Sequence, residues 1–112
     1  MLKQSKRIKG KDLIVSVLKD GAFRKHKTLT LREQKNEFGH NRYAIVLSKK
    51  LEKSAVKRNQ KRRQIYNAIY ELEKEGDVLE SRSFDIVILA REACLKIDFL
   101  ELKSALKAII NE

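Results

Sequence analysis

Residues 54–76 read SAVKRNQKRRQIYNAIYELEKEG, and this segment sets the architecture expected of the whole chain. Its second half places four apolar residues on one helical face, within about 60° of Ile65 on an ideal helix. Ser54 is a predicted N-cap and Gly76 a predicted stop signal, so the helix is expected to run to about Glu75.

The first half of the same helical face is cationic. On an ideal helix Arg58 lies at about 20° from Ile65, Lys61 at about −40° and Arg62 at about 60°. Burying three unpaired charges in a core would cost several kcal/mol each. The first half of the helix is therefore expected to overhang the edge of the core or to line an open groove beside it.

No acid interrupts the segment from Lys53 to Arg63, whereas a solvated helix face normally mixes acids with bases. Such a run predicts a phosphate-binding surface, because an arginine directs two donors at phosphate oxygens and Asn59 can bond a base edge or a sugar hydroxyl. Lys49 and Lys50 precede the helix and are expected to add to this surface. Two alternatives are a plain solvated face and a nuclear-import signal.

Outward from this helix, the chain alternates further helices and strands. Residues 84–90 form the strongest predicted strand, a near-continuous apolar run. A shorter strand near Phe23 is expected but has no definite bounds. The pattern predicts a single small α+β domain in the order helix, strands, helix, strand, helix, with the helices packed against one sheet. The other predicted elements are a helix over 11–20 closed by Gly21, strands over 28–32 and 42–48 joined by a polar turn, and a last helix that starts with the capping pair Asp98 and Glu101.

Positive charge is concentrated in the first part of the chain, as it is in the first half of the long helix. The chain has 112 residues, enough for one domain, with a net charge of +11 and a pI near 9.9. The first 63 residues carry a net charge of +15 and the remainder −4. This division predicts a polyanionic partner. A flexible basic arm is expected over residues 1–10, and the basic residues near the N-terminus are Lys3, Lys6, Arg7, Lys9 and Lys11.

Other classes of function receive no support from the sequence. No apolar run approaches the ~20 residues of a membrane span, and no apolar stretch directly follows the basic N-terminus, so neither a membrane protein nor a secretory signal is expected. The single cysteine, Cys94, suits a reducing cytoplasm and is expected to be a buried thiol. His26 and His40 are expected at the surface rather than in a metal site. Four aspartates have local explanations as caps, turns or strand ends, and they are Asp12, Asp77, Asp85 and Asp98.

The residues around the basic helix resemble a known family. Residues 48–50 are Ser-Lys-Lys, residues 55–63 are AVKRNQKRR and residues 85–91 are DIVILAR. This order is similar to that of the protein subunit of bacterial ribonuclease P, in which a strand ending in Ser-Lys-Lys precedes an Arg-Asn-x-x-Lys-Arg helix. The resemblance covers nearly the whole chain. It implies the order αβββαβα with a four-stranded sheet, and a ribosomal protein S5 domain 2-like fold. It also implies a left-handed crossover through the basic helix, contrary to the general rule.

The resemblance also implies which residues bind RNA. Positions 58, 59, 62 and 63 match family residues that contact the catalytic RNA near its active site. The full set of candidate RNA-binding residues is Lys49, Lys50, Lys57, Arg58, Asn59, Lys61, Arg62 and Arg63. Family members hold the single-stranded 5′ leader of precursor tRNA in a cleft between the sheet and the first helix. The candidates for this cleft are Ile14, Leu18, Arg32 and Tyr66.

Several of these positions depart from the family pattern. The family typically has aromatic residues at the positions of Ile14 and Leu18, and frequently one at Arg32. Aromatic stacking on an unpaired base contributes ~1–3 kcal/mol, and Arg32 can stack through its guanidinium instead. In the basic helix, Lys61 replaces a usual apolar residue and Tyr66 a usual arginine.

The function implied by the resemblance is that of a ribonuclease P subunit. Such a protein binds the ribonuclease P RNA and precursor tRNA and assists endonucleolytic 5′ maturation, while the RNA holds Mg²⁺ and hydrolyses the phosphodiester bond. No active site on the protein, no organic cofactor, no required protein partner and a cytoplasmic location are expected. One alternative is a ribosomal or other structural RNA-binding protein. Another is a helix-based DNA-binding module, which the strand-rich context of the basic helix disfavours.

Overall fold

The computed structural model describes residues 4–76 and 83–111 of the chain. The elements in chain order are α1 (Lys11–Asp20), β1 (Ala22–Lys25), β2 (Leu29–Lys35), β3 (Arg42–Val46), α2 (Ala55–Lys74), β4 (Phe84–Ala90) and α3 (Phe99–Ile110). Two short 3₁₀ helices, Gln4–Lys6 and Glu92–Lys96, precede α1 and α3. The four strands form one mixed sheet in the order β1-β2-β4-β3, so the predicted α+β class and four-stranded sheet are confirmed.

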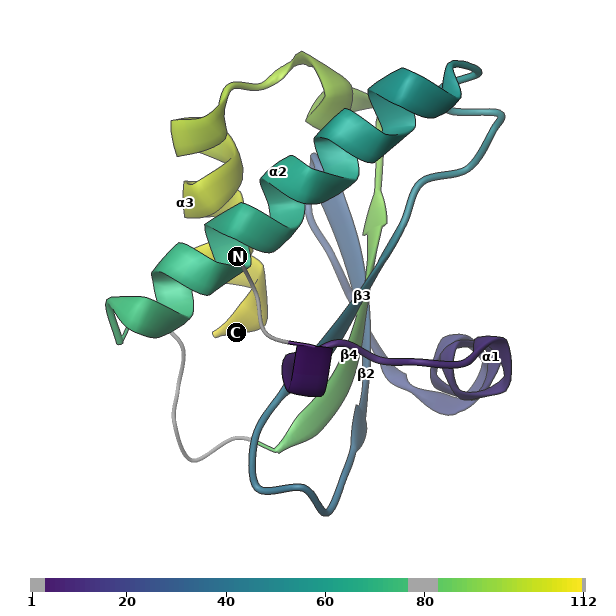
Figure 1. The fold of residues 1–112 in the computed structure, drawn as a ribbon, viewed down its shortest axis with the longest axis vertical. Helices are drawn as coiled ribbons and strands as arrows, with labels where there is room; N and C mark the ends of the chain where they lie inside the picture. Colours follow the sequence, from purple (N-terminus) through teal and green to yellow (C-terminus); the bar gives the residue numbers. More distant parts are fainter. Residues whose placement is uncertain (1–3, 77–82, 112) are drawn as a thin grey trace.

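Helices cover both faces of this sheet. Figure 1 shows α2 and α3 on one side of the strands and α1 on the other. β2 pairs antiparallel with both β1 and β4, whereas β3 pairs parallel with β4. The connection from β3 through α2 to β4 is therefore a crossover between adjacent parallel strands. Its left-handed sense stays a prediction.

The alternation of side chains along the strands divides the core into two clusters. On the α2 and α3 side, Leu31 of β2 and Ile88 of β4 are buried with Ile65 of α2. On the α1 side, Val87 of β4 is buried with Val17 of α1. Each fully buried aliphatic side chain contributes roughly 1.5–3 kcal/mol of transfer free energy, so the larger cluster on the α2 side supplies most of the driving force for folding.

β4 has its predicted bounds, whereas β2 and β3 differ from theirs. β2 starts at Leu29 instead of residue 28 and continues past Arg32 to Lys35, because all seven of its residues pair with β4. β3 ends at Val46 rather than Ser48. β1 is the short strand for which the sequence predicted no definite bounds. Its position is fixed by pairing with β2, in which Phe23 lies opposite Arg32.

The predicted caps of the two long helices are confirmed. The Ser54 side chain accepts a hydrogen bond from the backbone N–H of Lys57 at 3.2 Å. Gly76 follows α2 with φ +75°, the left-handed conformation that favours glycine at a helix end. The Asp98 side chain accepts from the backbone N–H of Glu101 at 2.9 Å and so caps α3 in the same way.

Gly21 joins α1 to β1 where two backbone segments approach closely. Its φ is −72°, so it does not take the left-handed conformation expected of a glycine after a helix. A Cβ at this position would lie 2.5 Å from the carbonyl oxygen of Val17 and 2.9 Å from that of Glu33. The glycine is therefore required for lack of space and not for its torsion angle.

We expect Gly21→Ala to lower the free energy of unfolding by about 1–3 kcal/mol, because the added methyl group overlaps backbone atoms that cannot easily move. Urea unfolding followed by circular dichroism measures this loss. Since alanine adopts φ −72° without strain, a position with room for the methyl would instead gain about 0.4–1 kcal/mol. A gain in stability would contradict the close approach.

A buried carboxylate ties the turn between β2 and β3 to the start of β4. Asp85 is 5% exposed and accepts hydrogen bonds from Arg42 Nε at 2.8 Å and Arg42 Nη2 at 2.7 Å. Asn36 Nδ2 donates to the same carboxylate at 2.9 Å. The pairing with Asp85 raises the pKa of Arg42, against the opposing effect of burial. The prediction for Asp77, another aspartate given a local role, falls outside the described residues.

The described part of the predicted N-terminal arm is packed against the domain, which corrects the expectation of a flexible arm there. Arg7 pairs in parallel with Tyr43 at the outer edge of β3, and the Ile8 N–H donates to the Tyr43 carbonyl at 2.8 Å. Ile8 is buried, and Lys6 forms an ion pair with Glu73 of α2. This segment covers part of the edge of the sheet, which would otherwise expose unpaired backbone groups.

Candidate nucleic-acid interface

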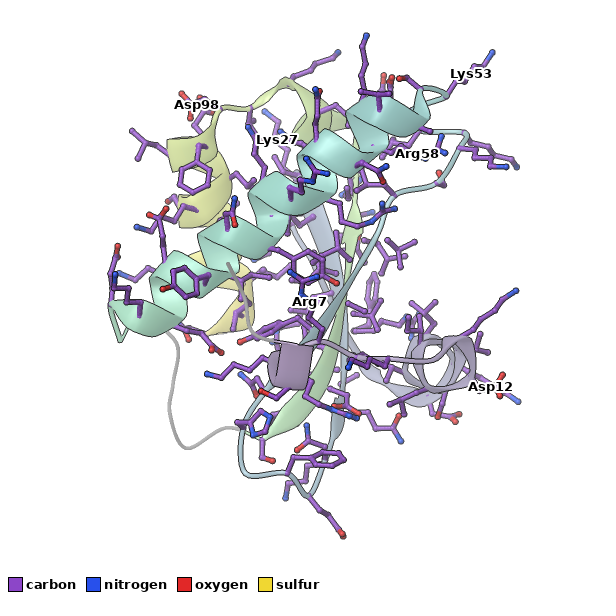
Figure 2. All side chains as sticks on the ribbon, in the orientation of Figure 1. Arg7, Asp12, Lys27, Lys53, Arg58 and Asp98 are labelled. Atoms are coloured by element: carbon purple, nitrogen blue, oxygen red, sulfur yellow. The ribbon has the colours of Figure 1, made fainter. Side chains whose placement is uncertain are left out.

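The N-terminal half of α2 carries its basic side chains outside the core, with the exception of Lys61. Buried residues of α2 begin at Lys61, and none of residues 55–60 is buried. The predicted overhang is therefore confirmed for the first turn and a half of the helix. Figure 2 shows Lys53 and Arg58 at this end of the molecule. Of the candidate RNA-binding residues, Lys49, Lys50, Lys57, Asn59 and Arg63 are exposed, and Arg58 and Arg62 are half-buried.

The start of α2 has an excess of positive charge that nothing in the helix offsets. Its first turn contains no acidic residue. The backbone N–H groups at a helix N-terminus already carry partial positive charge, so cations such as Lys57 and Arg58 are unfavourable there and repel one another. A bound anion would relieve both effects.

Hydrogen bonds fix the orientation of two arginines in this half of the helix. Arg58 Nη1 donates to the carbonyl oxygens of Glu52 at 2.8 Å and Lys53 at 3.0 Å. Arg58 therefore braces the loop between β3 and α2. Arg62 Nη1 donates to Asn59 Oδ1 at 2.7 Å, which aligns the two side chains on adjacent turns.

Lys61 does not lie exposed on this basic surface, which corrects its expected placement, while its role in RNA binding stays a prediction. Only 9% of the residue is exposed, and its Nζ donates to the carbonyl of Ile97, just before α3, at 3.2 Å. The carbonyl compensates part of the cost of burying the ammonium, and the aliphatic stem packs in the core. The helical angle placed Lys61 correctly on the buried stripe. The error was the assumption that its charge must reach solvent.

A hollow of 250 Å³ lies beside the basic half of α2, on the side that faces the N-terminal segment. Figure 2 shows Arg7 between that segment and the helix. Arg7 Cζ lies 4.4 Å from the centre of the Tyr66 ring, a cation–π contact. Three guanidinium groups border the hollow, and no carboxylate is among its lining residues in the part of the chain that the structure describes. The lining residues are Arg7, Asn59, Arg62, Arg63, Tyr66 and Asn67.

Tyr66 belongs to this hollow, which corrects its assignment to a cleft beside the first helix. It projects from α2 and packs against the core cluster on the α2 side, on the face of the sheet opposite to α1. Burial raises the pKa of the Tyr66 hydroxyl, while Arg7, a hydrogen bond with the Ile45 backbone and Arg62 act in the opposite direction. The ring is therefore a neutral phenol at physiological pH and a suitable partner for the Arg7 guanidinium.

The other three cleft candidates do lie together on the α1 side of the sheet. Ile14 and Leu18 are partly buried against the small core cluster there. Arg32 Nη1 donates to the Gly21 carbonyl at 3.3 Å, and its Cζ lies 4.9 Å from the centre of the Phe23 ring. Phe23 is 50% exposed. It provides an aromatic ring beside positions that lack one.

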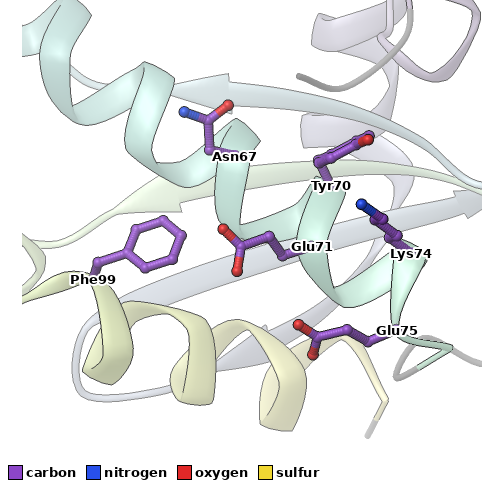
Figure 3. A pocket seen from close by; sticks show the side chains of 6 residues that line it. All are labelled: Asn67, Tyr70, Glu71, Lys74, Glu75 and Phe99. Atoms are coloured by element: carbon purple, nitrogen blue, oxygen red, sulfur yellow. The ribbon is translucent and has the colours of Figure 1, made fainter.

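A larger groove of 780 Å³ lies where α2 meets the start of α3, and Figure 3 shows its lining side chains, among them Tyr70 and Phe99. Lys103 of α3 donates to Glu71 at 3.2 Å and to Glu75 at 2.6 Å. The hydrogen bond to Glu75 is the main cause of the raised pKa of Lys103. The two carboxylates are thus paired with a cation of α3, and the groove does not extend the basic surface.

The surroundings of the cysteine and of the two histidines indicate structural roles. Cys94 is fully buried, as predicted, and burial raises the pKa of its thiol. His26 and His40 are partly exposed, and a ring nitrogen of His40 is hydrogen-bonded with the Ser5 carbonyl at 3.1 Å. Within residues 4–76 and 83–111, no group of three His, Cys, Asp or Glu side chains could hold a metal ion. Across those ranges no helix is long and apolar enough to span a membrane.

Three residues at these surfaces were not predicted as site residues from the sequence, namely Arg7, Phe23 and Asn67. Arg7 belonged to the expected arm, and no local pattern connects it with Tyr66, which lies 59 positions later. Phe23 lies in a four-residue strand, too short for an alternating pattern to be recognised. The only signal in the sequence was an apolar residue beside basic ones, namely Ile8 in the N-terminal segment and Phe23 in the segment that forms β1.

Comparisons with known proteins give similarities along nearly the whole chain. A family model described as Ribonuclease P matches residues 2–112. A ribonuclease P protein component of Clostridium botulinum is 31% identical over 96 residues, which cover 86% of this chain and 83% of that protein. The structure of a Staphylococcus aureus RNase P protein mutant is 25% identical, with a TM-score of 0.79 over 95% of this chain and 86% of that chain. The Thermotoga maritima RNase P protein is 20% identical and has the same fold, with a TM-score of 0.81 over 94% of each chain.

Proposed function

Since the chain belongs to the ribonuclease P protein family, we propose that it is the subunit that binds the catalytic RNA of ribonuclease P and the 5′ leader of precursor tRNA. Family membership makes it a component of an endoribonuclease of tRNA processing. In the proposal, the protein assists 5′ maturation by binding and orienting RNA, and the RNA subunit carries out the hydrolysis.

The observation that supports this proposal most strongly is the acid-free basic half of α2. Exposed lysine and arginine side chains, together with Asn59, lie on the half of α2 that also holds the positive end of the helix dipole. Arginine forks and a helix N-terminus both suit phosphate oxygens, while Asn59 can reach a base edge or a ribose hydroxyl. A surface of this kind binds a nucleic-acid backbone, with an affinity that falls steeply as salt rises.

The magnesium chemistry belongs to the RNA in this proposal. Mg²⁺ prefers oxygen ligands and is commonly held by phosphates with one or two carboxylates. The residues lining the basic hollow offer guanidinium and amide groups and a phenol, which do not suit a cation, whereas the bound RNA brings phosphates in number. The proposal needs no organic cofactor and no second protein, and it places the subunit in the cytoplasm with its RNA.

The leader is assigned to the α1 side of the sheet. Ile14 and Leu18 offer a partly buried apolar surface there, and Arg32 with Phe23 offers a stacked guanidinium and ring. An unpaired base can stack on either of these planar groups. Phe23 thus takes the part that the resemblance gives to aromatic residues at the positions of Ile14, Leu18 and Arg32.

We expect Phe23→Ala to lower the affinity of the holoenzyme for precursor tRNA with a leader by about fivefold or more, since one stacked base contributes ~1–3 kcal/mol. Affinity for tRNA that lacks a leader should not change. The matched control is Phe38→Ala, because Phe38 is 58% exposed but lies in the turn between β2 and β3. An equal loss with both tRNAs would contradict the assignment of the leader to this face.

The experiment that tests the proposal is equilibrium binding of precursor tRNA, with and without a 5′ extension, to ribonuclease P RNA in the presence and absence of this protein. The proposal predicts that the protein binds the RNA and increases affinity mainly for the substrate with the extension. A structural RNA-binding protein would bind the folded RNA without any preference for the extension, and that result would favour the alternative.

A further inference from the structure

The hollow between Arg7 and α2 is arranged to receive an anion that the folded domain does not itself supply. Arg7, Arg62 and Arg63 border it together with the amides of Asn59 and Asn67. Arg7 Nε is shielded from solvent and has no hydrogen-bond partner within the described structure. A buried donor of this kind is unfavourable while it stays unpaired, so a ligand that accepts from it recovers that free energy.

Arg7 is held rigidly although it comes from the N-terminal segment. Its backbone pairs with Tyr43 of β3, and the next residue, Ile8, is buried. Its guanidinium lies over the Tyr66 ring at 4.4 Å. The ring contact and the backbone pairing fix the plane of the guanidinium before any ligand arrives, so little side-chain entropy remains to be lost on binding.

The size and charge of the hollow indicate the class of ligand. Its 250 Å³ is below the ~300–1,000 Å³ typical of sites for whole small-molecule ligands. Three guanidinium groups border it and no carboxylate among the described residues lines it, which favours a compact group of high negative charge. Planar guanidinium forks match the oxygens of a phosphate in pairs.

We propose that this hollow binds a single phosphate group of the bound RNA, with Arg7 as a phosphate-binding residue and Tyr66 as the ring that positions it. The proposal rests on the RNA-binding function proposed above and adds a site to it. The N-terminal segment then forms part of the interface jointly with α2, and Tyr66 contributes by orienting a guanidinium supplied from elsewhere in the chain.

The first test uses the protein alone with inorganic phosphate as the probe. The side-chain Nε–H signal of Arg7 is followed by nitrogen-15 NMR during the titration. A saturable shift of this signal is expected in the wild-type protein. Tyr66→Phe should keep the response because the ring is retained, whereas Tyr66→Leu should weaken it several-fold. An Arg7 signal that does not respond to phosphate would overturn the site, whatever the outcome with RNA.

The second test measures the affinity of the protein for ribonuclease P RNA as a function of salt. Arg7→Ala should weaken binding on the order of tenfold and lower the slope of log K against log salt by about 0.7–1, the loss of one phosphate contact. The matched control is Lys9→Ala, which removes the same charge from an exposed residue two positions away and should weaken binding less than twofold.

The two tests separate the site from the function. Equal losses for Arg7→Ala and Lys9→Ala would show that only overall charge matters and would overturn the assignment of the phosphate to RNA. If the wild-type protein failed to bind ribonuclease P RNA, the proposed function would fail, while the phosphate titration would still decide whether the hollow is an anion site.

Discussion

Arg62→Ala combined with Arg63→Ala is expected to weaken binding to ribonuclease P RNA on the order of 100-fold, because a hydrogen bond to a charged group contributes about 1.5–3 kcal/mol. Both side chains border the same hollow on α2 and lie outside the core. Arg58 is a poorer choice, since it also holds the loop before α2 through two carbonyl oxygens. Alanine favours helix formation, so α2 should stay intact. Filter binding or fluorescence anisotropy at fixed salt measures the effect.

The control for this variant is Lys74→Ala combined with Lys96→Ala, which removes the same two charges from exposed residues outside the basic half of α2. Long-range attraction alone would weaken both double variants equally. A specific contact surface predicts less than a threefold loss for the control. Equal weakening of the two variants would contradict the assignment of the RNA to this half of α2.

Asp85→Ala is expected to lower the free energy of unfolding by about 3 kcal/mol, the largest stability effect among the changes considered. The carboxylate accepts two hydrogen bonds from Arg42 and one from Asn36, and its removal leaves a largely buried guanidinium without its counter-charge. Breaking a buried pair by removing one partner typically costs 3–5 kcal/mol. The lower end applies because Arg42 also lies over Phe38, at 4.1 Å, in an exposed turn.

Urea unfolding of Asp85→Ala measures this loss, and Asp20→Ala provides the control. Asp20 is exposed at the end of α1, where removing a carboxylate should change stability by less than about 0.5 kcal/mol. Asp85→Asn keeps one acceptor oxygen and should lie between the wild type and Asp85→Ala. A loss below about 1 kcal/mol for Asp85→Ala would show that the buried pair does not hold the turn to β4.

The elements that could be predicted from sequence are those with a complete local pattern. The long helix had a cap, an apolar stripe and a terminal glycine, and its structure agrees at both ends. The apolar run 84–90 became the central strand β4 with its predicted bounds. β1 could not be bounded because it has four residues, and its position depends on pairing with β2.

The site was predicted in part, for a related physical reason. Charge along one helix is a local property, so the exposed basic half of α2 followed from its sequence. The contacts that each side chain makes in the folded protein depend on the partners that folding brings close to it. Lys61 finds the carbonyl of Ile97, and Tyr66 finds Arg7. Both partners are distant in sequence, and neither contact leaves a periodic trace.

The central claim is that this chain is the protein partner of a catalytic RNA. Cleavage of precursor tRNA at low Mg²⁺ by a bacterial ribonuclease P RNA, with and without the protein, tests it most directly. The account predicts correct 5′ maturation only when both components are present, and no cleavage by the protein alone. An absence of stimulation, under conditions where binding of the protein to that RNA is confirmed, would contradict it.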